Sequence, residues 1–350
     1  MYAILNKASN FIRWRDWGPG KIPVFCTLLA YIALANHNFA MGFLFYFVLF
    51  MLFAVIHSAL GYVLNDWGDR EIDRLHGKTN AFENLSHFQG IVALAILFIM
   101  ALLSGLPFVR RPFVLPLWLG WAFFALAYSL KPVRLKERGI WGLGFSSVAQ
   151  WTLPVLLTFA AMERFGEWDM IVFAIANTIS GATLEVAHQR YDRAHDLSTQ
   201  TNTFGMRTDP AKLNRLYVIA LFLDKMAFGV VLITIFVGIA PLTQGTGVIR
   251  LGVPILAIYL VLLAIALFEN IRASTKGEFL DPYYSSKHSA NKLLHETMPN
   301  LALPGYLLLL VTIFQPVNGI LLLAFLCWRL MLGQADWQWP FRALQAWLSK

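Results

Sequence analysis

Charged residues are scarce in this sequence, and their scarcity sets the first limit on the protein. Only 14% of the 350 residues are Asp, Glu, Lys or Arg, whereas 58% are hydrophobic and the mean hydropathy is +0.59. A soluble domain needs a largely polar surface, so this composition excludes an ordinary soluble fold. No low-complexity tract interrupts the apolar segments. We therefore expect a single membrane domain over residues 1–350, with a transmembrane bundle at 22–333 and a C-terminal tail at 334–350.

Cysteine is also scarce, with only Cys26 and Cys327 in apolar segments at opposite ends of the chain. They lack the CxxC spacing of a metal or redox centre, and we interpret both as buried thiols. The net charge of +8 comes from basic residues in the loops between apolar segments. Membrane orientation and anionic lipid explain that charge, so we expect the lipid bilayer, and no nucleic acid, as a partner.

Apolar runs of about 20 residues, the length that crosses a bilayer as a helix, recur along the chain. They predict an all-α integral membrane protein with about nine transmembrane helices. The predicted spans are 22–36, 41–64, 89–106, 113–130, 141–161, 168–187, 214–240, 249–268 and 300–333. The last run contains Pro316 and Gly319 and could be two short helices, so nine or ten spans are possible.

Lys and Arg are concentrated on one side of the predicted membrane domain. By the positive-inside rule that side is cytoplasmic, and it carries the N-terminus and the loops 65–88, 188–213 and 269–299. These loops also hold 12 of the 20 acidic residues. We expect a multi-pass protein of a bacterial inner membrane, with its active-site loops in the cytoplasm.

The first acidic cluster follows the second predicted span. It consists of Asn65, Asp66, Asp69 and Asp73. On an α-helix these residues point to one face about 100° wide, so three carboxylates converge. Carboxylates repel one another unless a cation lies among them, and repulsion is costly at the end of a membrane helix.

The second acidic cluster follows the sixth predicted span. It consists of Glu185, Gln189, Asp192 and Asp196. At about 100° per residue these four also share one helical face. Either cluster alone could be a solvated loop. Two such clusters at corresponding places favour a site in which Mg²⁺ ions bind a diphosphate between them, because Mg²⁺ binds carboxylates together with phosphate oxygens.

A basic segment closes the fourth predicted span on the same side. Lys131, Arg134 and Lys136 follow Tyr128 there, and they could offset negative charge on a departing diphosphate. The alternative is that the three residues only anchor the loop in the cytoplasm. Tyr128 could also belong to the interfacial aromatic belt.

These three segments together resemble the UbiA superfamily of intramembrane prenyltransferases. The first cluster matches the motif NDxxDxxxD in full, and the segment from Tyr128 to Lys136 is similar to the family's Y-[ST]-x-x-P/K-x-R-L-K segment. Asp192 and Asp196 match the second aspartate motif, but its first acidic position is Glu185 here, and the usual extra aspartate is either replaced by His188 or missing. The resemblance implies helices around a central cavity, with acidic cytoplasmic loops capping it.

The resemblance also implies a reaction, the Mg²⁺-dependent ionisation of an allylic polyprenyl diphosphate and capture of the cation by an acceptor. The implied metal ligands are Asp66, Asp69, Asp73, Asp192 and Asp196. The residues expected to assist are Lys131, Arg134 and Arg193, with Asn65 orienting a phosphate or acceptor oxygen. The residues expected to bind substrate are Asn65, Tyr128, Lys131, Arg134, Lys136, Glu185, His188, Gln189 and Arg193.

The sequence says less about the acceptor. An aromatic quinone precursor is the favoured hypothesis. The alternatives are a polyprenyl-phosphate phosphoribosyltransferase, in which the clusters hold a sugar diphosphate, and an ion-coupled transporter. A polar group before the first span could line the acceptor entrance or could be a membrane anchor; it consists of Arg13, Arg15, Asp16 and Lys21. A second polar group, in the loop 269–299, could cover the site as a lid or could be a solvated loop. It consists of Asp281, Tyr283, Tyr284, Lys287, His288, His295 and Glu296.

Overall fold

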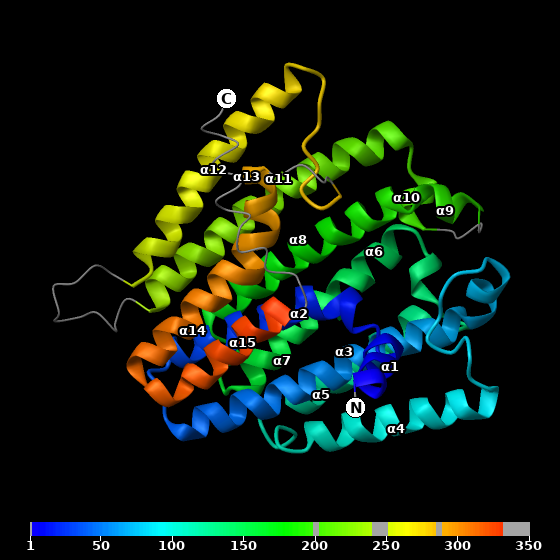
Figure 1. Ribbon diagram of the computed structural model, residues 1–350, viewed down its shortest axis with the longest axis horizontal. Coiled ribbons are helices and arrows are strands. Elements are labelled where there is room, and N and C mark those ends of the chain that lie inside the picture. Colours follow the sequence, from blue (N-terminus) through cyan, green and yellow to red (C-terminus); the bar gives the residue numbers. More distant parts are fainter. Residues whose placement is uncertain (1, 199–202, 240–250, 285–288, 332–350) are drawn as a thin grey trace. The chain divides into compact units, whose positions relative to one another are not determined.

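A computed structural model describes residues 2–198, 203–239, 251–284 and 289–331 of the chain, and the described residues are almost entirely helical (Figure 1). They contain no β-strand, only an isolated bridge between Gly139 and Thr203. This confirms the predicted all-α fold. The α-helices are α1 (Tyr2–Phe11), α2 (Trp14–Ala35), α3 (Met41–Leu75), α4 (His87–Gly105), α5 (Val114–Ser129), α6 (Ile140–Ser147), α7 (Leu153–Ala161), α8 (Trp168–Tyr191), α9 (Arg193–Ser198), α10 (Phe204–Arg207), α11 (Pro210–Gly238), α12 (Val253–Ser274), α13 (Ala290–Lys292), α14 (Leu303–Phe314) and α15 (Gly319–Met331).

In the described part of the chain, four short helical segments of other types connect or interrupt these helices. Two are 3₁₀-helices, η1 (Leu135–Glu137) and η5 (Pro316–Asn318), and two are π-helices, η2 (Val148–Thr152) and η4 (Leu293–Ala302). η2 joins α6 to α7, and η4 joins α13 to α14, so that each forms part of one long helical run.

Eight helical runs among the described residues are long and apolar enough to cross a membrane, and α5 and the 316–330 helix are shorter apolar candidates. These runs, with the family assignment reported below, make the chain an integral multi-pass membrane protein. For the last span, which could have been one helix or two, the structure has two helices, because α14 ends at Phe314 before Pro316 and α15 begins at Gly319. The predicted count of about nine spans stays a prediction, and the predicted tail 334–350 lies outside the described residues.

The chain packs as two compact units, the first of which is built from Met1–Gly18 and Tyr46–Ala227. Its interior includes an aromatic cluster between α3 and α5. There His57 accepts a hydrogen bond from the Trp118 indole at 2.6 Å, and its ring stacks on Trp121 at 5.2 Å. All three of the segments singled out from the sequence lie in this unit.

The second unit is built from Pro19–Phe45 and Phe228–Lys350. Asn318 in the α14–α15 turn donates to the carbonyl of Phe39 at 3.0 Å, beside a stacked pair of Phe39 and Phe314. Cys26 is buried here as predicted, but Cys327 on α15 is exposed. The second prediction is wrong because an apolar membrane helix can turn a side chain toward lipid as well as toward protein.

Candidate active site

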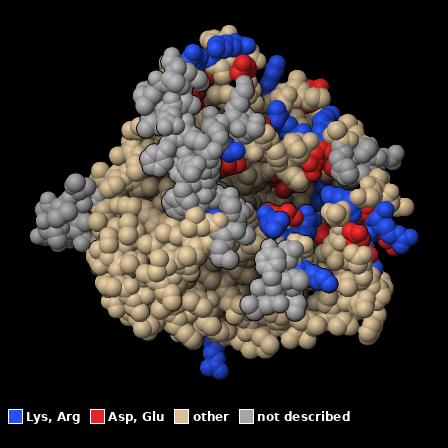
Figure 2. Space-filling view, in the orientation of Figure 1, with Lys and Arg blue, Asp and Glu red and all other residues tan. Residues whose placement is uncertain are grey.

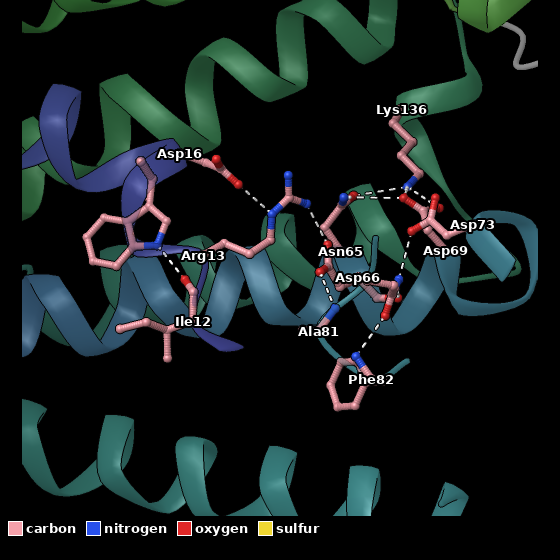
Figure 3. A network of polar contacts seen from close by, with 12 residues as sticks. Ile12, Arg13, Asp16, Asn65, Asp66, Asp69, Asp73, Ala81, Phe82 and Lys136 are labelled. Carbon is pink, nitrogen blue, oxygen red and sulfur yellow. Dashed lines mark hydrogen bonds and ion pairs between the residues drawn. The ribbon is translucent and has the colours of Figure 1, made fainter. Parts of the chain in front are cut away.

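Asp66 is the most enclosed carboxylate of the first cluster, with 1% of its surface exposed. It lies on α3, which runs without a break to Leu75, eleven residues past the end of the predicted membrane span 41–64. One carboxylate oxygen accepts from Arg13 at 2.6 Å and the other from the backbone N–H of Ala81 at 2.9 Å (Figure 3). Arg13 also donates to Asp16 at 2.7 Å. Asp66 therefore ties the α1–α2 junction to the loop that follows α3.

Asp69, about one turn further along α3, is paired with two cations. Arg134 donates to it at 2.8 Å and Lys136 at 2.5 Å, and Asn65 supplies a weaker contact at 3.3 Å. Lys136 also donates to the Asn65 side chain at 2.9 Å (Figure 3). Burial lowers the pKa of Lys136, and the nearby Asp69 carboxylate opposes that shift. Two basic residues of the third segment thus meet the first cluster.

Arg134 has a backbone conformation that few residues other than glycine adopt. Its φ is +40°, in the left-handed region. Besides Asp69, its guanidinium donates to the carbonyl of Gly68 at 2.9 Å and to Glu137 at 2.5 Å. These bonds keep the side chain against α3, with only 6% of its surface exposed.

The α3–α4 loop (residues 76–86) folds back over the acidic face of α3. Asn80 donates to the Asp73 carboxylate at 2.7 Å and to the backbone carbonyl of Asp66 at 2.8 Å. Phe82 is fully buried and meets Trp67 edge to face, with ring centroids 5.1 Å apart. The loop is therefore a packed part of the site, and it leaves one oxygen of Asp73 without a hydrogen-bond donor among the described residues.

The second cluster begins within α8. Glu185 accepts from the Ser146 hydroxyl at 3.0 Å and from the Gln189 amide at 2.8 Å. Gln189 in turn accepts from the backbone N–H of Gly205 at 2.8 Å. The continuous helix assumed for this cluster is wrong, because α8 ends at Tyr191 and α9 begins two residues later.

Asp192 lies at that break and faces His188 at 3.4 Å. Asp196, on α9, accepts from the Thr203 hydroxyl at 2.9 Å. The Arg193 guanidinium donates to the backbone carbonyls of Gly205 and Thr208, so its contacts stabilise the segment around α10. Both of these hydrogen bonds go to backbone carbonyls and not to an acidic side chain of either cluster.

Other predicted site residues differ in exposure. Lys131 is exposed and makes no ion pair with any described residue, unlike Arg134 and Lys136. His188 is also exposed, with 62% of its side chain accessible. Tyr128 is half-buried at the end of α5, and its neighbours include Glu185 and Ser146.

A chain of hydrogen bonds connects the helices that carry the two clusters. Tyr62 on α3 donates to Gln150 at 3.4 Å, and Gln150 donates to Ser146 at 3.0 Å. Ser146 then donates to Glu185 on α8. The two acidic clusters, 120 residues apart in sequence, are thus joined within one compact unit.

Charged side chains gather over one part of the visible surface in Figure 2, and large tan areas carry almost none.

Comparison with known proteins identifies the family. The model of the UbiA prenyltransferase family matches residues 24–280, which is most of the chain and includes all three segments. The chain belongs to this family.

Among its relatives in the UbiA family is a curated 4-hydroxybenzoate octaprenyltransferase from Hydrogenovibrio crunogenus, 28% identical over 156 residues. The match covers 43% of this chain and 52% of the relative, so the chain spans about half the length of the curated relative it matches. A UbiA homologue from Archaeoglobus fulgidus bound to GPP and Mg²⁺ has a TM-score of 0.55 at 15% identity, covering 87% of this chain and 99% of that one. The same homologue bound to DMAPP and Mg²⁺ gives 0.53 at 16% identity, covering 84% and 98%. These solved structures share the fold of this UbiA-family chain.

The donor chemistry of the two clusters fits Mg²⁺, which prefers carboxylate oxygen ligands. Asp66 and Asp69 are instead neutralised by Arg13, Arg134 and Lys136, and the described residues contain no group of three or more His, Cys, Asp or Glu side chains close enough to hold a metal ion. For these two carboxylates to bind a cation, the basic side chains would have to move aside.

Sequence reasoning missed several polar residues of this UbiA-family protein. Asn80, Ser146 and Gln150 carry no motif and are identified only by their contacts. It also missed a buried pair within α11, where Asp224 accepts from Ser180 on α8 and lies 3.2 Å from Lys225. A charged pair inside an apolar span would have been a usable signal.

The predicted lid residues of the loop 269–299 lie in the second unit. Tyr283 contacts His295 at 3.4 Å, and Asp281 accepts from the backbone N–H groups of Tyr283 and Tyr284. Lys287 and His288 lie outside the described residues.

Proposed function

We propose that this protein is an intramembrane prenyltransferase that moves a polyprenyl group from an allylic diphosphate to an acceptor in a Mg²⁺-dependent reaction. The observation that carries the proposal is the pairing of Arg134 and Lys136 with Asp69, which brings diphosphate-binding cations and metal-binding carboxylates into one site. Family membership and the neighbours solved with GPP, DMAPP and Mg²⁺ support it. The whole chain would act as one membrane domain with its N-terminus and acidic loops in the cytoplasm.

In the proposed mechanism this chain's own residues bind the donor and stabilise its leaving group. The residues that would hold Mg²⁺ are Asp66, Asp69, Asp73, Asp192 and Asp196. When bound, Mg²⁺ would neutralise charge on the leaving diphosphate. Arg134 and Lys136 would donate to diphosphate oxygens as the carbon–oxygen bond breaks, and Asn65 would orient an oxygen beside them.

The surroundings of the acidic helix ends suit the allylic cation that remains. Tyr62 and Tyr128 lie on α3 and α5 before the basic and acidic residues, toward the apolar parts of those helices. Their rings would stabilise a carbocation and exclude water from it. The favoured acceptor is an aromatic quinone precursor, which the curated 4-hydroxybenzoate octaprenyltransferase supports.

The first test is Mg²⁺-dependent release of diphosphate by the purified full-length protein in detergent. Geranyl, farnesyl and longer prenyl diphosphates would be compared with phosphoribosyl diphosphate, with membrane lysate as the source of acceptor. We expect release from a prenyl donor, its loss in Asp69→Ala, and its retention in Glu71→Gln, an exposed carboxylate on the same helix. Release from the sugar donor alone would replace this proposal with phosphoribosyl transfer, and no release from any donor would reject both.

A further inference from the structure

The helix α8 has two accessible sides. Ile171 and Ile175, with 52% and 56% of their surface exposed, mark the side that faces lipid. Asn177, Ser180 and Leu184 are also partly accessible, and at about 100° per residue they lie about 140–160° around the helix from those two. Contact with lipid therefore does not explain their accessible surface. We call these three residues the inner stripe.

Packing on both flanks of α8 leaves the inner stripe partly uncovered. On one flank Thr183, which is fully buried, donates to the carbonyl of Ala220 on α11 at 3.1 Å. On the other flank Gly181 packs against Trp151 of η2 so closely that a Cβ on Gly181 would lie 2.3 Å from the indole ring. The inner stripe lies between these two contacts, so neither α11 nor η2 covers it completely.

The inner stripe runs from the second acidic cluster toward the middle of the membrane. Leu184, Ser180 and Asn177 precede Asp192 on the chain and lie about 12, 18 and 22 Å from it along α8. A prenyl diphosphate held by the acidic clusters would extend its chain in this direction, because the clusters lie at the ends of the membrane helices and the chain is apolar. The chain would meet Leu184 first and the two polar side chains after it.

The deep end of the inner stripe is unusually polar for the interior of a membrane helix. Ser180 donates to Asp224 on α11, which lies 3.2 Å from Lys225, and these two charged residues are only 3% and 7% exposed. The amide nitrogen of Asn177 donates to the carbonyl of Phe173 at 2.9 Å, but its oxygen accepts no hydrogen bond from a described residue. An apolar chain laid against this end would displace water from the Asn177 oxygen and return no hydrogen bond, which is costly.

From this arrangement we infer that Asn177 and Ser180 limit the length of the prenyl donor, and that the donors of this protein are allylic diphosphates of two or three isoprene units. The inference rests on the proposed function. A Mg²⁺ ion and the diphosphate take up roughly 5 Å of the depth above Ser180, and an extended isoprene unit, with four bonds along the chain, spans about 5 Å. The remaining depth of about 13 Å holds two to three units. A fourth unit would reach the polar end, which selects against long donors by the desolvation that they would cause.

The test compares wild type with Asn177→Leu, which keeps the size of the side chain and removes its polar atoms. The matched control is Ile175→Leu, on the lipid side of the same helix. Mg²⁺-dependent diphosphate release by the full-length protein is measured with geranyl, farnesyl, geranylgeranyl and octaprenyl diphosphate, with membrane lysate as the source of acceptor. We expect kcat/KM of wild type to fall about 10-fold or more between farnesyl and geranylgeranyl diphosphate. Asn177→Leu should recover most of that loss and leave geranyl diphosphate within about 3-fold, and Ile175→Leu should match wild type at every length.

A binding measurement separates chain-length selection from a purely structural role of the inner stripe. Thiolodiphosphate analogues of the same donors, in which sulfur replaces the bridging oxygen at C1, should inhibit wild type more weakly once the chain exceeds three units, and Asn177→Leu should remove that dependence on length. Wild type that uses geranylgeranyl or octaprenyl diphosphate as well as farnesyl diphosphate would overturn the inference while leaving prenyl transfer intact. So would an Asn177→Leu variant that changes the rate by the same factor at every length. The absence of diphosphate release from any donor would remove the proposed function together with the inference.

Discussion

Replacing Asp69 with Asn tests whether the ion pairs at the first cluster hold the site together. The substitution keeps the size of the side chain and removes the charge that Arg134 and Lys136 share, at 2.8 Å and 2.5 Å. Only 6% and 13% of these two basic side chains are exposed, so Lys136 would stay buried without a counterion and Arg134 would keep only Glu137, at 2.5 Å. Removing one partner of a buried ion pair typically costs about 3–5 kcal/mol, and we expect Asp69→Asn to lower the free energy of unfolding by about 3 kcal/mol.

The measurement is equilibrium unfolding of the full-length protein in mixed micelles, with chelator present so that metal binding does not contribute. Glu71→Gln is the matched control, and we expect its effect to stay within about 0.5 kcal/mol. Adding Lys136→Met to Asp69→Asn should restore part of the loss, because one unpaired buried charge is then removed. Equal stability of Asp69→Asn and Glu71→Gln would refute the reasoning, and additive losses in the double variant would show that the pair is not coupled.

Three other expectations follow from single contacts. Burial lowers the pKa of Lys136, so just below the ordinary lysine pKa the unfolded chain binds more protons than the folded one. The free energy of unfolding should therefore rise with pH in that range. Lys136→Met should remove this slope when unfolding is measured at a series of pH values. Asp224→Asn and Lys225→Met should each destabilise by about 3–5 kcal/mol in micelle unfolding, and the double variant by less than their sum. A Cβ on Gly68 would lie 2.5 Å from the carbonyl oxygen of Ser129, so Gly68→Ala should cost about 1–3 kcal/mol and lower diphosphate release, whereas Gly61→Ala, with open space around it, should do neither.

The first acidic cluster illustrates what the sequence could predict. Helical periodicity put Asn65, Asp66 and Asp69 on one face, and the structure contains them on one unbroken helix. The spacing says nothing about the partners of these residues. Arg13 is 53 residues from Asp66, and Arg134 is 65 from Asp69, so both contacts depend on tertiary packing that no local pattern encodes.

The second cluster illustrates where periodicity fails. It assumed one helix through Asp196, whereas the helix breaks between Tyr191 and Arg193. The backbone N–H of Asp192 still donates to the carbonyl of His188, and that of Asp196 to the carbonyl of Asp192, so the break is local and leaves no strong signal in residue type. Likewise, apolar composition identified the membrane helices but could not tell that Cys327 is exposed, because lipid-facing and protein-facing positions are both apolar.

The pairing of acids with bases suggests why diphosphate and metal binding would depend on each other in the proposed enzyme. Asp66 and Asp69 are enclosed carboxylates, and without bound cations their charge is offset by Arg13, Arg134 and Lys136. A metal ion that took over this role would leave Lys136 without its carboxylate, and would leave Arg13 and Arg134 with only Asp16 and Glu137 as counterions. An anionic diphosphate would then supply the missing negative charge, so each ligand would lower the cost of binding the other. In this arrangement the basic residues neutralise the carboxylates before substrate binds, and they stabilise the leaving diphosphate afterwards. This double role accounts for their burial beside the acids.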